Sequence, residues 1–129
     1  LHLSLRRQRQ MCIRDSIRDA GARLQDRGGA QLTGLAYVDG VIVGLCEVVR
    51  FLADDAKVCE LGLVYVLPEH RGRGIGSAML RASLTRAKEI WEDLETVYCS
   101  YPADSPAANA IMRGLDAEVV SSTTAWQKN

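Results

Sequence analysis

The spacing of hydrophobic residues along the chain changes several times, and each change predicts a new structural element. Apolar residues at helical spacing predict helices at residues 17–25, from Gly74 or Ile75 to about residue 91, and at 107–115. Apolar runs rich in β-branched residues predict strands at 31–38, 41–51, 57–67 and 96–101. A last strand or hairpin-like pair is expected within residues 118–127.

The segments between these elements indicate how the strands are connected. Asp39 and Gly40 separate the first two strands, and Asp-Gly is a strong signal for a tight antiparallel hairpin. The strand–helix–strand order over residues 57–101 favours one parallel pair, because a crossover helix brings the chain back in the same direction. We therefore expect an α/β fold with a mixed sheet, in which helices pack on both faces.

Length and charge narrow the class of protein. The chain has 129 residues, which suits one domain, taken here as residues 17–129. Residues 1–16 are rich in Arg and Gln, and no period in them continues into the next segment. They are expected to be a non-native or disordered N-terminal extension, with a genuine basic tail as the alternative. Sixteen basic residues balance sixteen acidic ones, without the basic excess that is typical of nucleic-acid binders.

The remaining composition argues against a membrane or metal protein. No apolar run reaches the roughly 18 residues of a membrane span, and no signal-peptide pattern is present. We expect a cytoplasmic protein without a nucleic-acid or membrane partner. No cysteine lies in a CxxC or CxxH pair, so no metal site is expected. Cys46, Cys59 and Cys99 lie in apolar runs and are interpreted as small buried side chains, with a catalytic thiol as the alternative.

The stretch PEHRGRGIGS, at residues 68–77, carries the clearest chemistry. A nucleoside-triphosphate loop would need a lysine before its Ser or Thr, and none is present. A dinucleotide fingerprint would need a third glycine where Ser77 stands. Arg71, Gly74 and Gly76 instead fit a pyrophosphate cradle of the form R-x-x-G-x-G. The alternative is a glycine-rich turn with surface arginines that binds no ligand.

The helix that follows this stretch and the glycines within it both favour the binding of an anion. A strand ends at Pro68, and the following helix contributes partial positive charge at its N-terminus. Glycines let a diphosphate approach backbone amides that a Cβ would screen. Arg71 and Arg73 would add mobile charge at the rim, and Ser77 a hydroxyl donor.

Residues 64–76, VYVLPEHRGRGIG, resemble the acetyl-CoA motif of the GNAT superfamily of N-acetyltransferases. The similarity extends from about residue 32 to the C-terminus. The resemblance implies a GNAT-like fold in which two parallel strands, here 57–67 and 96–101, splay apart around the donor. It also implies transfer of an acetyl group from acetyl-CoA to a primary amine, by direct attack in a ternary complex. A complete member has more structure before the hairpin, so the domain is expected to be truncated at its N-terminus.

The resemblance assigns roles to residues of the motif. Backbone groups of Tyr65, Val66 and Leu67 would bind the pantetheine arm, and a bulge in that strand, for which Gly62 is a reasonable place, would expose them. Asn109 could reach the ligand or face solvent. Amides of the glycine loop would hold the pyrophosphate; the residues concerned are Arg71, Gly72, Arg73, Gly74, Ile75, Gly76 and Ser77.

The expected catalytic set is incomplete. Glu60 is the candidate general base, and in an unbroken strand it would share a face with Val64 and Val66. A strand-edge glutamate in water is the alternative. Met112 stands where family members carry the tyrosine that protonates the leaving thiolate, so Tyr101 is a weak candidate acid.

Two other functions remain open at this point. The chain could be a non-catalytic acyl-CoA-binding domain, either decayed or one half of a two-domain acetyltransferase. It could also be a structural or interaction module that binds no CoA. A C-terminal strand over residues 121–127 would offer an edge for a homodimer. The amine acceptor is not identified by any residue pattern.

Overall fold

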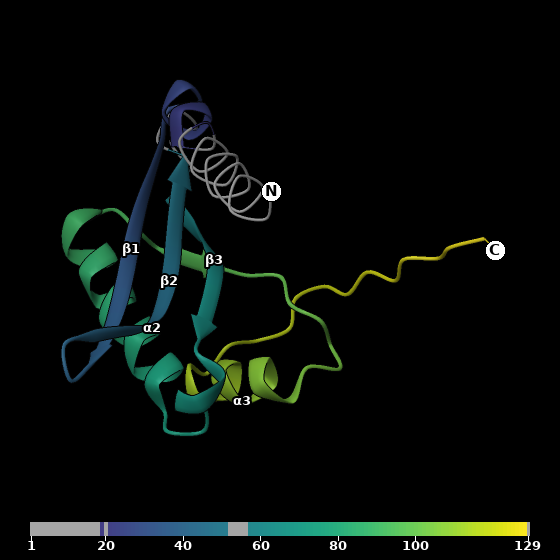
Figure 1. Ribbon diagram of the computed structural model, residues 1–129. Helices are drawn as coiled ribbons and strands as arrows, with labels where there is room; N and C mark the ends of the chain where they lie inside the picture. The colour runs from purple at the N-terminus through teal and green to yellow at the C-terminus, as the bar shows by residue number, and fades with distance from the viewer. Residues whose placement is uncertain (1–18, 20, 52–56, 129) are drawn as a thin grey trace, which may run out of the picture.

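The computed structural model describes residues 19, 21–51 and 57–128, and in these ranges helices pack against a four-stranded sheet (Figure 1). The strands are β1 (Gly29–Val38), β2 (Val41–Phe51), β3 (Val58–Val66) and β4 (Thr96–Tyr98). The 3-10 turn η2 (Pro68–His70) leads to the helix α2 (Ile75–Ile90), and α3 (Pro106–Gly114) follows β4. The expected extension at residues 1–16 lies outside the described residues.

The sheet has the order β1-β2-β3-β4 and the predicted mixed pairing. β1 and β2 form an antiparallel hairpin, β2 and β3 are also antiparallel, and β3 and β4 are parallel. Asp39 and Gly40 have φ angles of 49° and 77°, as a tight hairpin turn requires. Local turn chemistry and the helical crossover therefore account for the topology.

The helices begin and end close to the predicted positions. Residues 19 and 21–26, within the first predicted helix, are helical. The helix α2 begins at Ile75, after Gly74, and α3 begins at Pro106. Ser105 caps α3, since its side chain accepts a hydrogen bond from the amide of Ala108 at 3.3 Å.

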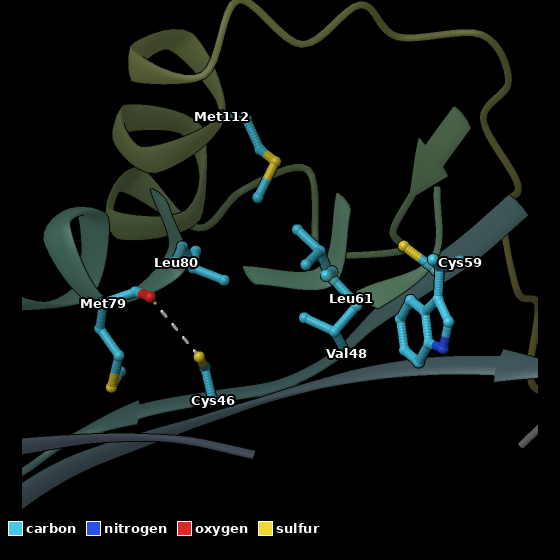
Figure 2. Close-up of a cluster of buried hydrophobic side chains, with 9 residues drawn as sticks. Cys46, Val48, Cys59, Leu61, Met79, Leu80 and Met112 are labelled. Atoms are coloured by element: carbon cyan, nitrogen blue, oxygen red, sulfur yellow. Dashed lines mark hydrogen bonds between the residues drawn. The ribbon is translucent and has the colours of Figure 1, made fainter. Parts of the chain in front are cut away.

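The core lies between the sheet and one side of α2 (Figure 2). Leu80, Ala87 and Trp91, which share the predicted face of the helix, are buried. Met112 brings α3 into the same cluster. The sheet contributes the buried side chains of Cys46, Val48, Cys59 and Leu61.

Close packing between β1 and α2 depends on Gly34. A Cβ at this position would overlap Ser83 Oγ of α2 and would lie 2.9 Å from Cys46 Sγ. Ser83 and Cys46 are themselves in contact, with Oγ and Sγ 3.1 Å apart in a buried environment. The helix can therefore approach the sheet closely only because residue 34 has no side chain.

The second face of the sheet is open among the described residues. Both α2 and α3 contribute to one core cluster on one side of the sheet. Alternate residues of β1 are exposed on the open face, namely Gln31, Thr33, Leu35 and Tyr37.

The strand expected within residues 118–127 is wrong. The described residues after Asp116 have no helix or strand, and the segment extends away from the sheet (Figure 1). Val120 and Trp126 are 90% and 91% exposed. The β-forming composition of this segment finds no neighbouring strand in the described chain, and a strand needs such a partner for its backbone hydrogen bonds.

An ion pair between the buried side chain of Arg50 and the exposed side chain of Asp93 lies at the other end of the core. Arg50 of β2 has a 6% exposed side chain and makes two 2.7 Å hydrogen bonds to the carboxylate of Asp93. Its guanidinium also lies 5.9 Å from the centre of the Trp91 ring. The hydrogen bonds from Arg50 lower the pKa of Asp93, and those to Asp93 raise the pKa of Arg50.

Candidate functional site

β3 contains a bulge opposite Glu47. Val48 of β2 pairs with Leu61, whereas Cys46, two positions earlier, pairs with Val64. β3 therefore has one extra residue between these pairs, within residues 62–63. The irregularity expected at Gly62 is confirmed.

The bulge changes which residues of β3 face the core. Leu61 is buried before the bulge, and Val64 packs against the core after it. Glu60 therefore does not share a face with Val64, as an unbroken strand would require. It lies on the open side of the sheet with Leu63 and Tyr65, which are 50% and 42% exposed.

The parallel strands separate immediately after Glu60. Their ladder pairs Val58 with Thr96 and ends with Glu60 opposite Tyr98. β3 continues to Val66, but β4 ends at Tyr98. The splayed strand pair is present, although β4 is shorter than the predicted strand at 96–101.

A cavity of about 340 Å³ occupies this divergence. Residues 61–64 of β3 form one wall, residues 99–102 form the other, and α3 closes it with Ile111 and Met112. Its volume lies at the lower end of the range of small-molecule sites, which is roughly 300–1,000 Å³. The bulge and the end of the ladder thus leave a mostly apolar slot between β3, residues 99–102 and α3.

The glycine loop, within residues 71–77, connects the end of β3 and the turn η2 to the start of α2. Gly72 and Gly74 have φ angles of 73° and 77°, in the left-handed region, and a Cβ on either would meet no atom within 4 Å. Gly76 is in α2, where a Cβ would make ordinary contacts of 3.6 Å to Ile111 and 3.7 Å to Val66. The backbone conformation therefore requires glycine at positions 72 and 74. No steric clash requires glycine at position 76.

The loop presents unpaired backbone donors at the N-terminus of α2. The first amide to enter the helical ladder is that of Ala78, which donates to Gly74. No acceptor in the described part of the chain is recorded for the amides of residues 72–77. Successive free amides and the dipole of a 16-residue helix form an anion-binding geometry.

Arg71 is anchored and is not the mobile rim charge that was expected. Its Nε donates to the carbonyl of Val66 at 2.8 Å, and its guanidinium lies 5.4 Å from the centre of the Tyr65 ring. Arg73 is exposed, and no side-chain contact is recorded for it among the described residues. The two arginines of the loop therefore have different roles in the fold.

The backbone of β3 offers a different set of groups from the one predicted. The amide of Leu67 donates to Val43 at 2.8 Å, and its carbonyl accepts from the amide of His70 at 2.9 Å. Leu67 is thus saturated, and Tyr65, two residues earlier, also directs its backbone towards β2 because the pairing alternates. The groups that point into the divergence belong to Val66, which was predicted, and to Val64, which was not.

Other predicted ligand residues, Asn109, Ser77 and Ile75, lie in different surroundings. The Nδ2 of Asn109 donates to the carbonyl of Ala103 at 2.9 Å and ties α3 to the preceding loop. Ser77 and Ile75 are half-buried in the first turn of α2. Ser77 lies beside the unpaired amides of the glycine loop, whereas the side-chain amide of Asn109 is hydrogen-bonded to the loop that precedes α3.

The candidate proton donors differ in position. Tyr101 is half-buried and lines the cavity, whereas Tyr98 is 48% exposed. Met112 is 9% exposed, and its Sδ lies 3.4 Å from Cys99 Sγ. The methionine is a packing residue here, and Tyr101 is the tyrosine that the fold brings to the slot.

A second carboxylate lies near the bulge. A Cβ on Gly62 would be 3.5 Å from the Cβ of Glu47 and 3.7 Å from its Oε2, so Glu47 lies over this glycine. Glu47 and Glu60 are half-buried. Sequence reasoning missed Glu47 because its place depends on the pairing of β2 with the bulged strand, for which no local signal exists.

The cysteines behave as buried thiols. Cys46 and Cys59 are at most 1% exposed. Burial raises the pKa of Cys59. Burial and, to a lesser extent, the charge of Glu60 raise the pKa of Cys99. Raised values keep these thiols protonated near neutral pH, which disfavours a thiolate nucleophile.

Neither a membrane-spanning helix nor a metal-binding cluster is found within the described ranges. No helix there is long and apolar enough to cross a membrane. No cluster of three or more His, Cys, Asp or Glu side chains in those ranges could hold a metal ion.

Several solved structures with a similar fold are named as acetyltransferases. Aminoglycoside N-acetyltransferase AAC(6')-Iy in complex with CoA superposes with a TM-score of 0.62 and 18% identity, covering 93% of this chain and 90% of that one. AAC(6')-IG from Acinetobacter haemolyticus gives 0.60 and 23% identity, covering 89% and 80%. Ribosomal-protein-alanine N-acetyltransferase from Brucella melitensis biovar Abortus 2308 gives 0.58 and 21%, covering 82% and 73%. At these identities the likeness shows the fold.

Sequence comparison supplies the family. No curated protein matches the chain in sequence. The model of the acetyltransferase (GNAT) family matches residues 4–115, which include the hairpin, the bulged strand, the glycine loop and α3. The chain belongs to the GNAT family of acetyltransferases.

Proposed function

We propose that the protein transfers an acetyl group from acetyl-CoA to a primary amine by direct attack within a ternary complex. The observation that carries this proposal is the adjacency of two features. One is the row of unpaired amides at residues 72–77, and the other is the slot that opens beside the bulge in β3. A ligand with a diphosphate at one end and a thin flexible arm would use both.

The diphosphate would lie on the loop, where the φ angles of Gly72 and Gly74 direct the backbone outwards. The pantetheine arm would run along β3, using the outward backbone groups of Val64 and Val66. Its thioester would reach the slot near Gly62, where the strands have parted. The AAC(6')-Iy structure with CoA, which has the same fold, supports this class of donor.

The acceptor would approach from the open face of the sheet, where Glu60 and Glu47 lie. The neutral amine nitrogen forms a bond to the acetyl carbon, and the carbon–sulfur bond breaks. Glu60, directly or through water, would take the proton that the amine loses. The thiolate would leave as CoA and take a proton from water or from the hydroxyl of Tyr101.

A second candidate function has its own observation. Met112 is buried in the core where the resemblance places a proton-donating tyrosine, so a domain that binds acyl-CoA without transferring the acyl group is the alternative. The two functions share the donor site and differ only in turnover.

Binding and turnover are tested separately. Acetyl-CoA at about 100 times its dissociation constant should stabilise the fold by roughly 2.7 kcal/mol, a clear rise in the melting temperature. Release of free CoA thiol is then measured with a panel of primary amines. Binding with turnover supports the transferase, and binding without turnover by any amine supports the alternative.

Gly74→Asp, with Gly40→Asp as the matched control, locates the donor. Both glycines have a φ of 77° and open surroundings, so the two variants share backbone strain and added charge. Only Gly74→Asp should abolish the shift, because it puts a carboxylate where the diphosphate would lie. Loss of the thermal shift in both variants, or retention of the shift in both, would contradict the proposed donor site.

A further inference from the structure

The side chain of Arg71 points back towards the strand it follows. Its Nε donates to the Val66 carbonyl at 2.8 Å, and the guanidinium stacks 5.4 Å from the centre of the Tyr65 ring. Both contacts are made to the end of β3, before the chain enters η2 and the glycine loop. Arg71 thus bridges the turn η2 and ties the start of the glycine loop to the end of β3.

We propose that Arg71 is a positioning residue, which acts by bracing the glycine loop against the end of β3 through Val66 and Tyr65. This inference rests on the proposed donor site. The loop needs such a brace, because Gly72 and Gly74 have wide conformational freedom and nothing within 4 Å of a built Cβ to confine them. Bracing lowers the conformational entropy that a diphosphate would otherwise have to remove.

The brace also couples the two parts of the donor site. Val66 is the last residue of β3 whose backbone points into the divergence, and its carbonyl is held by Arg71. The guanidinium is planar and presents a donor at Nε while its face covers an aromatic ring, a combination that lysine cannot reproduce. The arm-binding strand and the phosphate-binding loop are therefore fixed relative to each other by one side chain.

Arg73 provides the internal contrast. It belongs to the same loop and carries the same charge, but it is exposed and has no recorded contact among the described residues. A contribution of Arg73 to CoA binding would be a direct charge effect, which salt screens. The contribution of Arg71 would instead depend on Tyr65 and be insensitive to salt.

The test is CoA binding by calorimetry at low and high salt, with the full chain. The variants are Arg71→Ala, Arg71→Lys, Tyr65→Leu, Tyr65→Phe, the Arg71→Ala/Tyr65→Leu double variant and Arg73→Ala. Arg86→Ala, on the far part of α2, controls for loss of a surface arginine that is paired with Glu89. Melting temperatures confirm that each variant is folded.

We expect Arg71→Ala to weaken CoA binding by about tenfold with an unchanged salt dependence, and Arg71→Lys not to restore it. Tyr65→Leu should weaken binding more than Tyr65→Phe, which keeps the ring. The double variant should be no weaker than Arg71→Ala alone, since both changes break one brace. Arg73→Ala should lower the salt dependence.

The nitrogen–proton NMR signal of Arg71 Nε gives a readout that does not depend on affinity. It should be protected from exchange in the free protein and stay so when CoA is added. A brace would be overturned by loss of that signal on CoA addition, by additive effects of Arg71→Ala and Tyr65→Leu, or by unchanged affinity in Arg71→Ala. A parent protein that binds no CoA would instead overturn the proposed function, and the inference with it.

Discussion

Glu60 of β3 and Tyr98 of β4 form the last pair of the parallel ladder. Beyond them the strands part, and one residue later β3 enters its bulge. Glu60 therefore lies at the point where the slot opens, with its side chain on the open face of the sheet. The end of the parallel ladder therefore places Glu60 where, in the proposed reaction, an acceptor amine would lose its proton.

Glu60→Gln should lower kcat by roughly 100-fold while leaving acetyl-CoA affinity unchanged, because the amide cannot accept a proton. Stopped or continuous assays of CoA release, with calorimetry for binding, measure both effects.

Two further variants, Glu47→Gln and Glu92→Gln, are compared with Glu60→Gln in the same assays. Glu47 lies over Gly62, so its loss should raise the KM for a cationic acceptor more than it lowers kcat. Glu92 is an exposed carboxylate after α2 and serves as a charge control. A larger fall in kcat for Glu47→Gln than for Glu60→Gln would move the proton-accepting role to Glu47.

Gly76→Ala should separate stability from donor binding. The position is helical and a methyl group would make only ordinary contacts, so the free energy of unfolding should rise by up to about 1 kcal/mol. Acetyl-CoA affinity should fall, since the methyl would stand beside the amides that face the diphosphate. Gly21→Ala, in a helical segment with no atom near its built Cβ, should be no less stable than the parent and bind normally.

Gly34→Ala should destabilise the fold by about 1–3 kcal/mol, because the added methyl would overlap Ser83 Oγ and press on Cys46. Chemical denaturation measures the change. Adding Ser83→Ala to this variant removes the obstructing oxygen and should recover part of the loss. If the second substitution made the protein less stable still, crowding at Gly34 would be the wrong explanation.

The pair of Arg50 and Asp93 should make stability depend on pH. The pKa of Asp93 is lowered in the folded state, so its contribution is complete above the unfolded pKa near 3.8 and is lost as pH falls through the folded value. At pH 7 Asp93→Asn should be clearly less stable than the parent, since it leaves a buried guanidinium without its carboxylate. The difference should shrink in acid, as denaturant midpoints from pH 7 to pH 2 would show.

Glu95→Gln is the control for this pH effect. Its partner Lys57 is about half exposed, so the exposed pair should contribute little, and the variant should follow the parent curve. A constant gap between Asp93→Asn and the parent at all pH values would contradict the linkage.

Much of the fold followed from local patterns. The Asp39-Gly40 turn and the start of α2 after Gly74 each depend on a few neighbouring residues, and both are confirmed. The strand at residues 118–127 failed because β-forming composition produces a strand only where another strand is available to pair with it.

By itself, the sequence determined the family motif, the order of the elements and the conformation of the glycine loop, because a positive φ at Gly72 and Gly74 is a property of the residue and its turn. Only the tertiary structure decided which side chains and backbone groups meet in the site. The bulge depends on how β2 pairs with β3, and it puts Glu60 and Tyr65 on one face of the strand and Val64 and Val66 on the core face. The place of Glu47 beside Gly62 depends on the same long-range pairing, which no local pattern encodes, whereas Arg71 contacts residues only five and six positions earlier in the chain.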